Sequence, residues 1–452
     1  MKIRTNYNDI RKNTKKADTS KMKKPENPFN PNSAVVPALF AGRTDTAISM
    51  LRKFRQVKSG QSSSFIFTGE RGIGKTALAK FVKYMVTINE EDFENLNFIT
   101  SYYAVEKDQD FGYVLQTSLN QLTDQLPDKT LDRLQKRVGD FFKNGKFAIG
   151  AFGAKVEMDK KEREVQKQHL KDVAVSIFTN ILKGIEEAED PHNGILIIID
   201  EAHNISDMSG IAMLLRNIAT TLDINGLGRV SFLIIGYPHA IDLFFDGDPS
   251  AKRHFDNVFL DRMPLNEAKE ILIKGFNEVN LKYDEKDLDN FIAYTGGYPH
   301  AVQVLGHNVV EKVYGDEILN AHWIEGVHLT AKELASKDFS NLYKFNKKTT
   351  SKEVLMDILA VVGKPVTRQE LSSLTSDKNL SRTINELRKI GAIKIDKNTS
   401  KISLSSMLFN MAILFHISDK FTKENYLYDL RVEHNPALIQ SNSSEQLLLN
   451  ED

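Results

Sequence analysis

The chain has 452 residues and no cysteine. Disulfides, a catalytic thiol, cysteine-based zinc sites and iron–sulfur clusters are therefore excluded. A cysteine-free chain is compatible with a reducing compartment, and we expect a cytoplasmic protein. Net charge is also absent, because 60 Lys plus Arg balance 60 Asp plus Glu. A positive field over the whole molecule is excluded, so any nucleic-acid surface must be local.

Long apolar runs are missing as well. No segment approaches 18 uninterrupted apolar residues, so we expect no membrane span. The first residues are charged with no apolar run behind them, so we expect no secretory signal. Hydrophobic residues make up 41% of the chain and charged residues 27%, which is ordinary for a soluble globular protein. At roughly 100–200 residues per domain, the length indicates about three units.

Residues 34–264 alternate short β-rich runs with longer helical stretches. This alternation is typical of an α/β fold in which helices connect the strands of a parallel sheet. The predicted strands are SFIF (64–67), FITSYYAV (98–105), ILIII (195–199) and VSFLII (230–235). ILIII is apolar at every position, as expected of a strand buried on both faces. The irregular stretch at about 138–165 is predicted to be an insertion, either a surface flap or a self-association or partner element.

The remaining segments differ in composition from this core. Residues 265–345 read as helices and predict a small helical lid, while 346–416 read as three helices and a hairpin, the pattern of a winged helix. Residues 1–33 predict a basic flexible tail, which is either a solvated arm or an electrostatic contact to nucleic acid or an acidic partner. Residues 417–452 predict a polar C-terminal tail.

A phosphate-binding loop lies between the first predicted strand and the helix that follows it. The residues of the pattern G-x-x-x-x-G-K-[ST] are Gly69, Glu70, Arg71, Gly72, Ile73, Gly74, Lys75 and Thr76. The glycines allow successive N–H groups to turn around an oxyanion, and the first helical turn, which includes Ala77, adds its dipole and unpaired donors. Lys75 is expected to neutralise the terminal phosphates of ATP, and the Thr76 hydroxyl to bind Mg²⁺.

Two acidic residues end the ILIII strand. Asp200 is expected to hold Mg²⁺, mainly through water, because ligands bind at the carboxyl ends of strands in open α/β sheets. Glu201 is expected to orient and polarise the attacking water, the positioning role that dominates phosphoryl transfer. Together with the phosphate loop, this pair predicts an ATPase site.

The phosphate loop, the sequence IIIDEAHNIS and the upstream LFAGRTD (39–45) together resemble AAA+ ATPases. The branch they resemble holds the origin-recognition initiators and the bacterial transposition-regulator and secretion ATPases, and it shades into the STAND signalling NTPases. The resemblance implies a five-stranded parallel core, a helical lid and often a C-terminal winged helix. It also implies ATP and Mg²⁺ as cofactors and a nucleotide-dependent homo-oligomer.

Further site residues follow from this resemblance. Arg43, in the upstream box, is expected near the adenine. Arg253 resembles the arginine finger that reaches the γ-phosphate in a neighbouring subunit, although it is equally well explained as a surface arginine; Arg262 is the weaker candidate. His300, after a Gly-Gly turn, stands where the lid usually carries a sensor arginine, and could face the phosphates or serve in capping or packing.

The first sensor of the family is a polar residue at the end of the fourth core strand. Here that strand ends in Gly236-Tyr237-Pro238, without Asn or Thr. The ending resembles the G-x-P of the transposition and secretion relatives. Weak sensors predict slow turnover, as in a switch rather than a motor.

Basic residues gather on the third helix and hairpin of the predicted winged helix. They are Lys378, Arg382, Arg388, Lys389, Lys394, Lys397 and Lys401. Such positions could contact DNA phosphates, with backbone binding favoured over base readout, but winged helices also dock on proteins and exposed lysines are common.

The sequence thus predicts an ATP-binding and ATP-hydrolysing AAA+ switch that couples nucleotide state to a DNA or protein partner. Two alternatives stay open. One is a STAND-like signalling ATPase, for instance in phage defence. The other is an ATP-dependent scaffold with little hydrolysis.

Overall fold

The computed structural model describes part of the chain, in several separate segments. The described residues are 24–33, 40–88, 95–126, 160–186, 191–245, 249–337, 350–396 and 399–405, with isolated residues between 339 and 343 and between 409 and 417. The chain divides into two compact units, Asn32–Met263 and the combination of Met1–Pro31 with Pro264–Asp452. The predicted tail 417–452, apart from Ile417, and most of the predicted insertion 138–165 lie outside the described residues.

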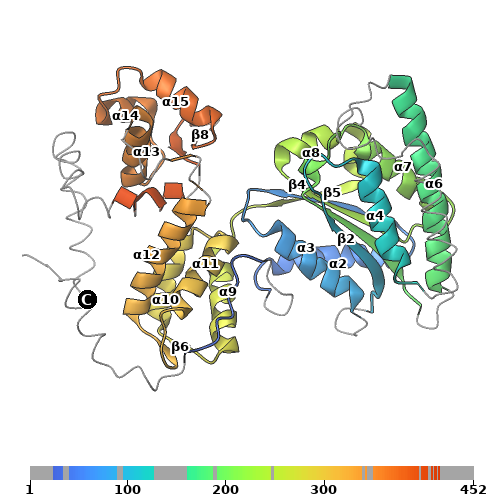
Figure 1. The fold of residues 1–452 in the computed structure, drawn as a ribbon, viewed down its shortest axis with the longest axis horizontal. Helices are drawn as coiled ribbons and strands as arrows, with labels where there is room; N and C mark the ends of the chain where they lie inside the picture. Colours follow the sequence, from blue (N-terminus) through green and yellow to red (C-terminus); the bar gives the residue numbers. More distant parts are fainter. Residues whose placement is uncertain are drawn as a thin grey trace, which may run out of the picture. The chain divides into compact units, whose positions relative to one another are not determined.

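A parallel sheet of five strands forms the centre of the first unit. Its strands are β1 (Ser64–Gly69), β2 (Phe98–Ala104), β3 (Gly194–Asp200), β4 (Val230–Gly236) and β5 (Phe255–Leu260). They lie in the order β2-β3-β4-β1-β5, and every neighbouring pair is parallel (Figure 1). The α/β fold class is therefore confirmed. Since all strands run the same way, their carboxyl ends share one edge of the sheet, where β4 separates the strand before the phosphate loop from the strand that ends at Asp200.

Helices cover both faces of this sheet (Figure 1). They are α2 (Thr44–Lys58), α3 (Lys75–Thr87), α4 (Phe111–Thr123), α6 (Lys160–Glu186), α7 (Ile211–Ile224) and α8 (Pro238–Phe244), with short 3-10 turns η4 (Ala202–Asn204) and η5 (Pro249–Arg253). On one face Phe54 of α2 packs against Phe65 and Phe98 of the sheet. On the other, α4, α6, α7 and α8 share one buried cluster with the strands. The central strand β3 is buried at every position, as its apolar run predicts.

The strand β5 is the strand of this sheet that the sequence patterns did not predict. It occupies a sheet edge, and in its sequence FDNVFL only the first and last residues are buried. Phe259 is 61% exposed. A half-buried edge strand needs no continuous apolar run, and FDNVFL shows no regular alternation of apolar and polar residues either, so its sequence carries little strand signal.

The second unit begins with four longer helices. They are α9 (Leu265–Glu278), α10 (Glu285–Ile292), α11 (Pro299–Val310) and α12 (Asn320–Lys337), with the 3-10 turn η6 (Ala293–Thr295) and a two-residue parallel pair, β6 (Lys282–Tyr283) and β7 (Glu317–Ile318). Trp323 is fully buried and stacks on Phe291 at 5.5 Å between ring centroids. The helical composition is that expected for this region, while its assignment as a lid stays a prediction.

Three helices and a hairpin follow. These are α13 (Ser351–Val362), α14 (Arg368–Leu374), α15 (Leu380–Lys389) and the antiparallel strands β8 (Ile393–Ile395) and β9 (Ile402–Leu404), with one further antiparallel bridge from Val366 to Ile402. Thr367 and Glu370 form the capping box that opens α14. The elements bury a hydrophobic cluster of their own. Their order is the one expected for a winged helix, and that assignment stays a prediction.

One part of the expected N-terminal tail is packed. Phe29 is only 4% exposed and lies edge-to-face against Phe276 of α9, with ring centroids 5.6 Å apart. The expectation of a flexible arm over 1–33 is therefore wrong for the residues around Phe29. The basic composition hid a short Asn-Pro-Phe segment whose aromatic ring finds a hydrophobic site on the helices.

Candidate nucleotide site

The phosphate loop joins β1 to α3 in the conformation that its glycines allow. Gly72 and Gly74 have φ of 77° and 91°, in the left-handed region that other residues rarely adopt. Gly74 is also the residue that precedes α3, so the free N–H groups of the first helical turn follow the loop directly. Backbone donors at a helix N-terminus are suited to bind a phosphate group.

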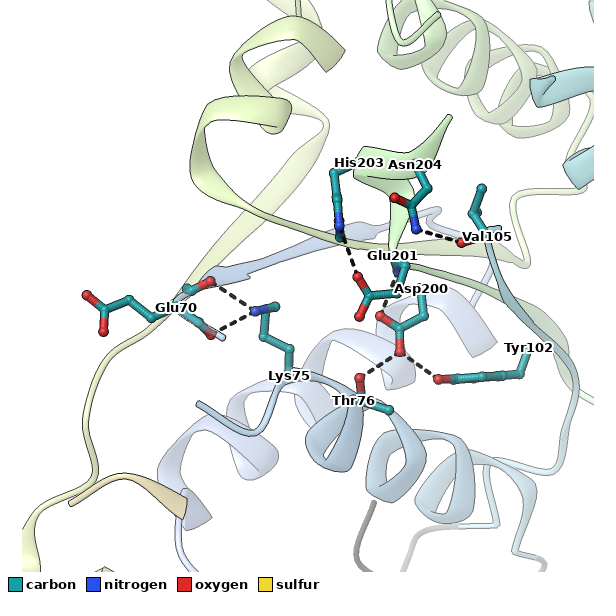
Figure 2. Close-up of polar contacts among 10 residues, drawn as sticks. Glu70, Lys75, Thr76, Tyr102, Val105, Asp200, Glu201, His203 and Asn204 are labelled. Atoms are coloured by element: carbon teal, nitrogen blue, oxygen red, sulfur yellow. Dashed lines mark hydrogen bonds and ion pairs between the residues drawn. The ribbon is translucent and has the colours of Figure 1, made fainter. Parts of the chain in front are cut away.

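Lys75 points its ammonium group back into the loop. Its Nζ donates to the carbonyl oxygens of Gly69 and Glu70, each at 2.9 Å (Figure 2). Burial lowers the pKa of Lys75 below its ordinary value, and the charges of Glu201 and Asp200 offset this only in part. A partly desolvated ammonium held at the loop is well placed to gain from a phosphate anion.

Asp200 lies at the end of β3 and accepts two hydrogen bonds on one carboxylate oxygen. Thr76 Oγ1 donates to Asp200 Oδ2 at 2.7 Å, and the phenol of Tyr102 donates to the same oxygen at 2.6 Å (Figure 2). The other oxygen, Oδ1, accepts from the backbone N–H of Glu201 at 2.8 Å. Asp200 is 2% exposed, so these donors are what balances its buried charge.

Sequence reasoning missed Tyr102. It stands near the end of β2, in register with Ile198 of the adjacent β3, and reaches across to the carboxylate. Burial, followed by the charge of Asp200, raises the pKa of its phenol far above the ordinary value. The Tyr102 phenol therefore keeps its proton and is a hydrogen-bond donor at any physiological pH. The available signal was its place at the carboxyl end of a predicted strand, but the pairing of β2 with β3 cannot be read from one sequence.

Glu201 occupies a strained backbone position directly after the strand. Its φ is 54°, a left-handed conformation that is uncommon for a residue with a side chain. Its Oε2 lies 3.2 Å from Nε2 of His203 (Figure 2). Asn204 connects this turn to the residue after β2, because its side-chain amide donates to the carbonyl oxygen of Val105 at 2.9 Å. The turn thus fixes where the Glu201 carboxylate can reach.

Tyr237 directly follows the end of β4, the point where the resemblance led us to expect a sensor residue. Its ring lies under the ammonium of Lys75, 4.9 Å from the centroid, and packs against the His203 ring at 4.3 Å between centroids. Burial raises the pKa of the Tyr237 phenol, with a further contribution from Glu201. The strand order explains this placement, because β4 lies between β1 and β3. An aromatic phenol therefore connects the phosphate loop to the acidic pair.

Arg43 forms a hydrogen bond with the backbone of the phosphate loop. Its guanidinium donates to the carbonyl oxygen of Ile73 at 3.0 Å and to that of Asp261 at 2.7 Å. These bonds connect the phosphate loop to the end of β5. The geometry makes Arg43 a positioning residue for the loop, and direct contact with adenine stays a prediction.

The two remaining expected site residues are Arg253 and His300. Arg253 is exposed at the end of η5, just before β5. His300 lies in the first turn of α11 in the second unit. Their roles as finger and sensor stay predictions.

The donor set fits Mg²⁺ that arrives with a nucleotide. The Thr76 hydroxyl and the Asp200 carboxylate are hard oxygen ligands that already lie 2.7 Å apart. Within the described residues no group of three or more His, Asp or Glu side chains could hold a metal by itself. The remaining ligands would be phosphate oxygens and water, which is how Mg²⁺ is usually bound beside a phosphate loop.

Comparison with protein families agrees with this geometry. Residues 58–244 match the family model described as an AAA domain. This part of the chain is an AAA+ P-loop ATPase domain. The matched region contains the phosphate loop, the acidic pair and the strands β1 to β4, so the family resemblance seen in the motifs is confirmed.

Solved structures share the fold at low sequence identity. The ORC2 protein of Aeropyrum pernix in its ADPNP–ADP complexes has a TM-score of 0.54 and 15% identity, over 88% of this chain and 99% of that chain. Its ADP form has a TM-score of 0.48 and 14% identity, over 86% and 97%. A Walker-type ATPase of Pyrococcus abyssi has a TM-score of 0.44 and 13% identity, over 83% and 96%. The first likeness supports an origin-recognition-like fold, and at this identity it shows fold alone.

No curated protein matches the sequence significantly. Among the described residues, no helix combines the length and the apolar character needed to cross a bilayer.

Proposed function

We propose that this protein binds ATP with Mg²⁺, hydrolyses it slowly, and uses the nucleotide state to switch its engagement of a macromolecular partner. The carrying observation is the hydrogen bond between Thr76 and Asp200, which brings the two oxygen ligands of a magnesium ion together beside the phosphate loop. The loop's backbone donors and Lys75 would bind the phosphates. Bound Mg²⁺ would supply charge neutralisation on the phosphate oxygens.

Glu201 is the proposed residue for the attacking water. Its carboxylate is exposed enough to meet solvent, at 46% of the side-chain surface, and is paired with His203. Orienting and polarising a water requires only that this pair open toward the phosphate. We propose that Tyr237 contributes at the sensor point, because its ring already contacts both Lys75 and His203.

The test separates binding from hydrolysis. Glu201→Gln keeps the shape and removes the base, so ATP affinity should stay within about threefold while single-turnover hydrolysis falls by about 10²–10⁴. Lys75→Ala should abolish binding measured by calorimetry with Mg²⁺-ATP. Glu186→Gln is the matched control and should change neither quantity. It alters a carboxylate that pairs with Arg229, next to the amino end of β4. Equal hydrolysis by the wild type and Glu201→Gln would refute the role of Glu201.

DNA is the partner that the C-terminal elements favour. Five of the predicted basic contact residues on α15, just before it and on the hairpin are exposed: Lys378, Arg388, Lys389, Lys394 and Lys401. Arg382 is also exposed, but it donates to Glu386 at 2.8 Å, which neutralises part of its charge. The surface is thus suited to phosphate contacts rather than to base recognition.

A salt titration of DNA binding tests this assignment, with and without Mg²⁺-ATP. Binding through phosphates should weaken steeply as salt rises, and Arg388→Ala with Lys389→Ala should reduce the slope by about two counterions. Binding that responds to ATP would support a DNA-engaged switch. No binding under either condition would instead favour the signalling ATPase, and undetectable single-turnover hydrolysis would favour the scaffold.

A further inference from the structure

A notch between the helices α9 and α11 holds the side chain of Phe29. Phe29 is only 4% exposed, and Gly275 of α9 and Gly306 of α11 face its ring. A Cβ on Gly275 would lie 2.2 Å from the ring, and one on Gly306 would lie 2.8 Å from it. At both glycines the three atoms nearest to such a Cβ belong to Phe29. The notch therefore has the size of one aromatic ring, and a single methyl group on either wall would fill it.

The backbone of α9 and α11 does not require glycine at these two positions. Neither Gly275 nor Gly306 has a positive φ, and glycine weakens a helix interior because it has the most backbone freedom to lose. The space that the two glycines leave is therefore what they contribute. A third wall is Phe276, whose ring lies edge-to-face with that of Phe29 at 5.6 Å between centroids. Two glycines and an aromatic edge around one ring indicate a site shaped for an aromatic side chain.

Asn27, two residues before the ring, is bound by the end of α11 and the residue after it. Its side-chain amide donates to the carbonyl oxygen of His307 and to Oε1 of Glu311, both at 3.0 Å. Its Oδ1 accepts from the Phe29 N–H at 3.1 Å, which closes the turn that presents the ring. The carbonyl oxygen of Phe29 lies 3.0 Å from Nδ1 of His307, and this nitrogen donates because a carbonyl oxygen can only accept. Both the Asn side chain and the backbone of Phe29 are thus recognised.

Two neighbours of this pair fit the same site. Pro28 is half-buried, has no N–H that would need a partner, and restricts the free segment through its fixed φ. The ammonium of Lys24 pairs with Oε2 of Glu311, the oxygen that Asn27 does not contact. The hydrogen bond from Lys24, followed by that from Asn27, lowers the pKa of Glu311 below its ordinary value. The chemistry that fits the notch is thus a peptide with a basic residue followed by Asn-Pro-Phe.

We propose that this notch is a peptide-binding site for Asn-Pro-Phe, and that the chain's own segment 24–31 occupies it as an intramolecular ligand. The hydrogen bonds and the ion pair join residues 278–287 positions apart, and residues 24–30 form no helix or strand of their own. The segment is therefore held by the site alone, as a separate peptide would be. Both partners belong to the second unit, so the site does not depend on nucleotide. Any other peptide of this pattern must compete with the segment.

Binding of a free peptide to the full chain tests the site. Phe29→Ala removes the ring and opens the notch, so a capped, fluorescent peptide with the sequence of residues 24–31 should bind this variant saturably in fluorescence anisotropy. The wild type should bind it at least about tenfold more weakly, because its own segment competes at an effective concentration on the order of millimolar. Asn27→Asp, which keeps the ring, is a second receptor and should also bind the peptide more tightly than the wild type. No saturable binding to either variant, or equal binding to all three proteins, would overturn the proposal.

Altered peptides test which side chains the site recognises. Phe29→Ala in the peptide should weaken binding by more than about tenfold, because nothing fills the notch. Asn27→Asp in the peptide should do the same, since it replaces the amide donors by an oxygen that faces the Glu311 carboxylate and the His307 carbonyl. Equal affinity of all three peptides would show that the notch does not read Asn and Phe.

A substitution in the notch wall locates the peptide. Gly306→Ala, added to Phe29→Ala, should abolish peptide binding because its Cβ takes the place of the ring. The unfolding midpoint of this double variant should not fall, since alanine favours the helix and the ring is gone. Asn277→Ala, at an exposed position of α9 two residues from Gly275, is the matched control and should leave binding unchanged. Peptide binding that survives Gly306→Ala would lie elsewhere and would contradict the site.

Crosslinking decides whether the occupant comes from the same chain or from a second copy. A carbodiimide can join the Lys24 amine directly to the Glu311 carboxylate, because the two groups are in contact. In an equal mixture of isotope-labelled and unlabelled wild type, mass spectrometry should find this crosslink only within chains of one kind. Crosslinks between labelled and unlabelled chains would show that a second copy supplies the segment, and would overturn the intramolecular ligand.

Discussion

At the scale of single residues, the oxygen Oδ2 of Asp200 carries two donors of different kinds. Thr76 is expected to turn toward Mg²⁺ when nucleotide binds, whereas Tyr102 has no phosphate to meet and can stay on the carboxylate. The phenol would then keep the carboxylate oriented toward the metal. Tyr102 is thus a positioning residue that the motif patterns did not include.

Tyr102→Phe should raise the Mg²⁺ concentration for half-maximal ATP binding by about tenfold. Removing a hydrogen bond to a buried charge costs roughly 1.5–3 kcal/mol, and part of this is recovered by water. A fluorescent-nucleotide titration at several Mg²⁺ concentrations measures it. Tyr103→Phe is the control, because the Tyr103 phenol donates to Gln109 instead. Equal Mg²⁺ dependence in all three proteins would contradict the role of Tyr102.

Lys75 makes ATP binding depend on pH. Its pKa is lowered in the free protein by burial, and a bound triphosphate would raise it again. Between these two values binding takes up a proton, so affinity should fall as the pH rises above the free-state pKa. Calorimetry in two buffers of different ionisation enthalpy, at alkaline pH, measures the uptake. Lys83→Met, on the same helix, should retain it, and a binding reaction without proton uptake at any alkaline pH would contradict this account.

At the scale of elements, α13 and α15 are connected through one carboxylate. Glu386 accepts from Lys352 and from Arg382, each at 2.8 Å, and these hydrogen bonds, with Lys352 first, lower its pKa from 4.5 to about 2. A lowered folded-state pKa contributes stability that is present above the unfolded value and is lost as the pH falls through the folded value.

Glu386→Gln should therefore lower the unfolding midpoint by a few degrees or less near neutral pH, because the pair is at the surface. The difference from the wild type should shrink between pH 4.5 and pH 2. Differential scanning calorimetry over this range provides the measurement. A difference that is constant with pH would show that the charge of Glu386 plays no part.

Elements were predictable where burial is complete or where local chemistry marks an end. The run ILIII became β3, the Thr367–Glu370 box became the start of α14, and Gly391 follows the end of α15 with φ of 75°. The edge strand β5 and the packed segment around Phe29 were not predictable in this way. Both depend on contacts with segments distant in sequence, and neither has a strong period of its own.

At the scale of the whole molecule, the finger role predicted for Arg253 would require a second copy of the chain. Its side chain is exposed at the end of η5. Arg253→Ala should leave ATP binding unchanged and reduce hydrolysis by about 10³ or more if the guanidinium stabilises transition-state charge in a neighbour. Lys252→Ala, at the adjacent exposed position, is the control.

Mixing variants decides whether the arginine acts between subunits. A site with an intact Glu201 can meet an intact Arg253 only in mixed assemblies of Arg253→Ala and Glu201→Gln chains. The mixture should therefore hydrolyse ATP faster than either variant alone. Absence of recovery, in a mixture shown by sedimentation to assemble, would contradict a role in trans.

By itself, the sequence determined the α/β class, the phosphate loop, the acidic pair and the order of the later helices. These features depend on local residue types, because glycine conformations, helix caps and apolar runs act over a few neighbours. Only the tertiary structure decided that Tyr102 meets Asp200, that Tyr237 lies between Lys75 and His203, and that Phe29 fills a notch between two glycines. Each of these contacts joins residues from separate segments, and their meeting is fixed by strand order and helix packing rather than by any local pattern.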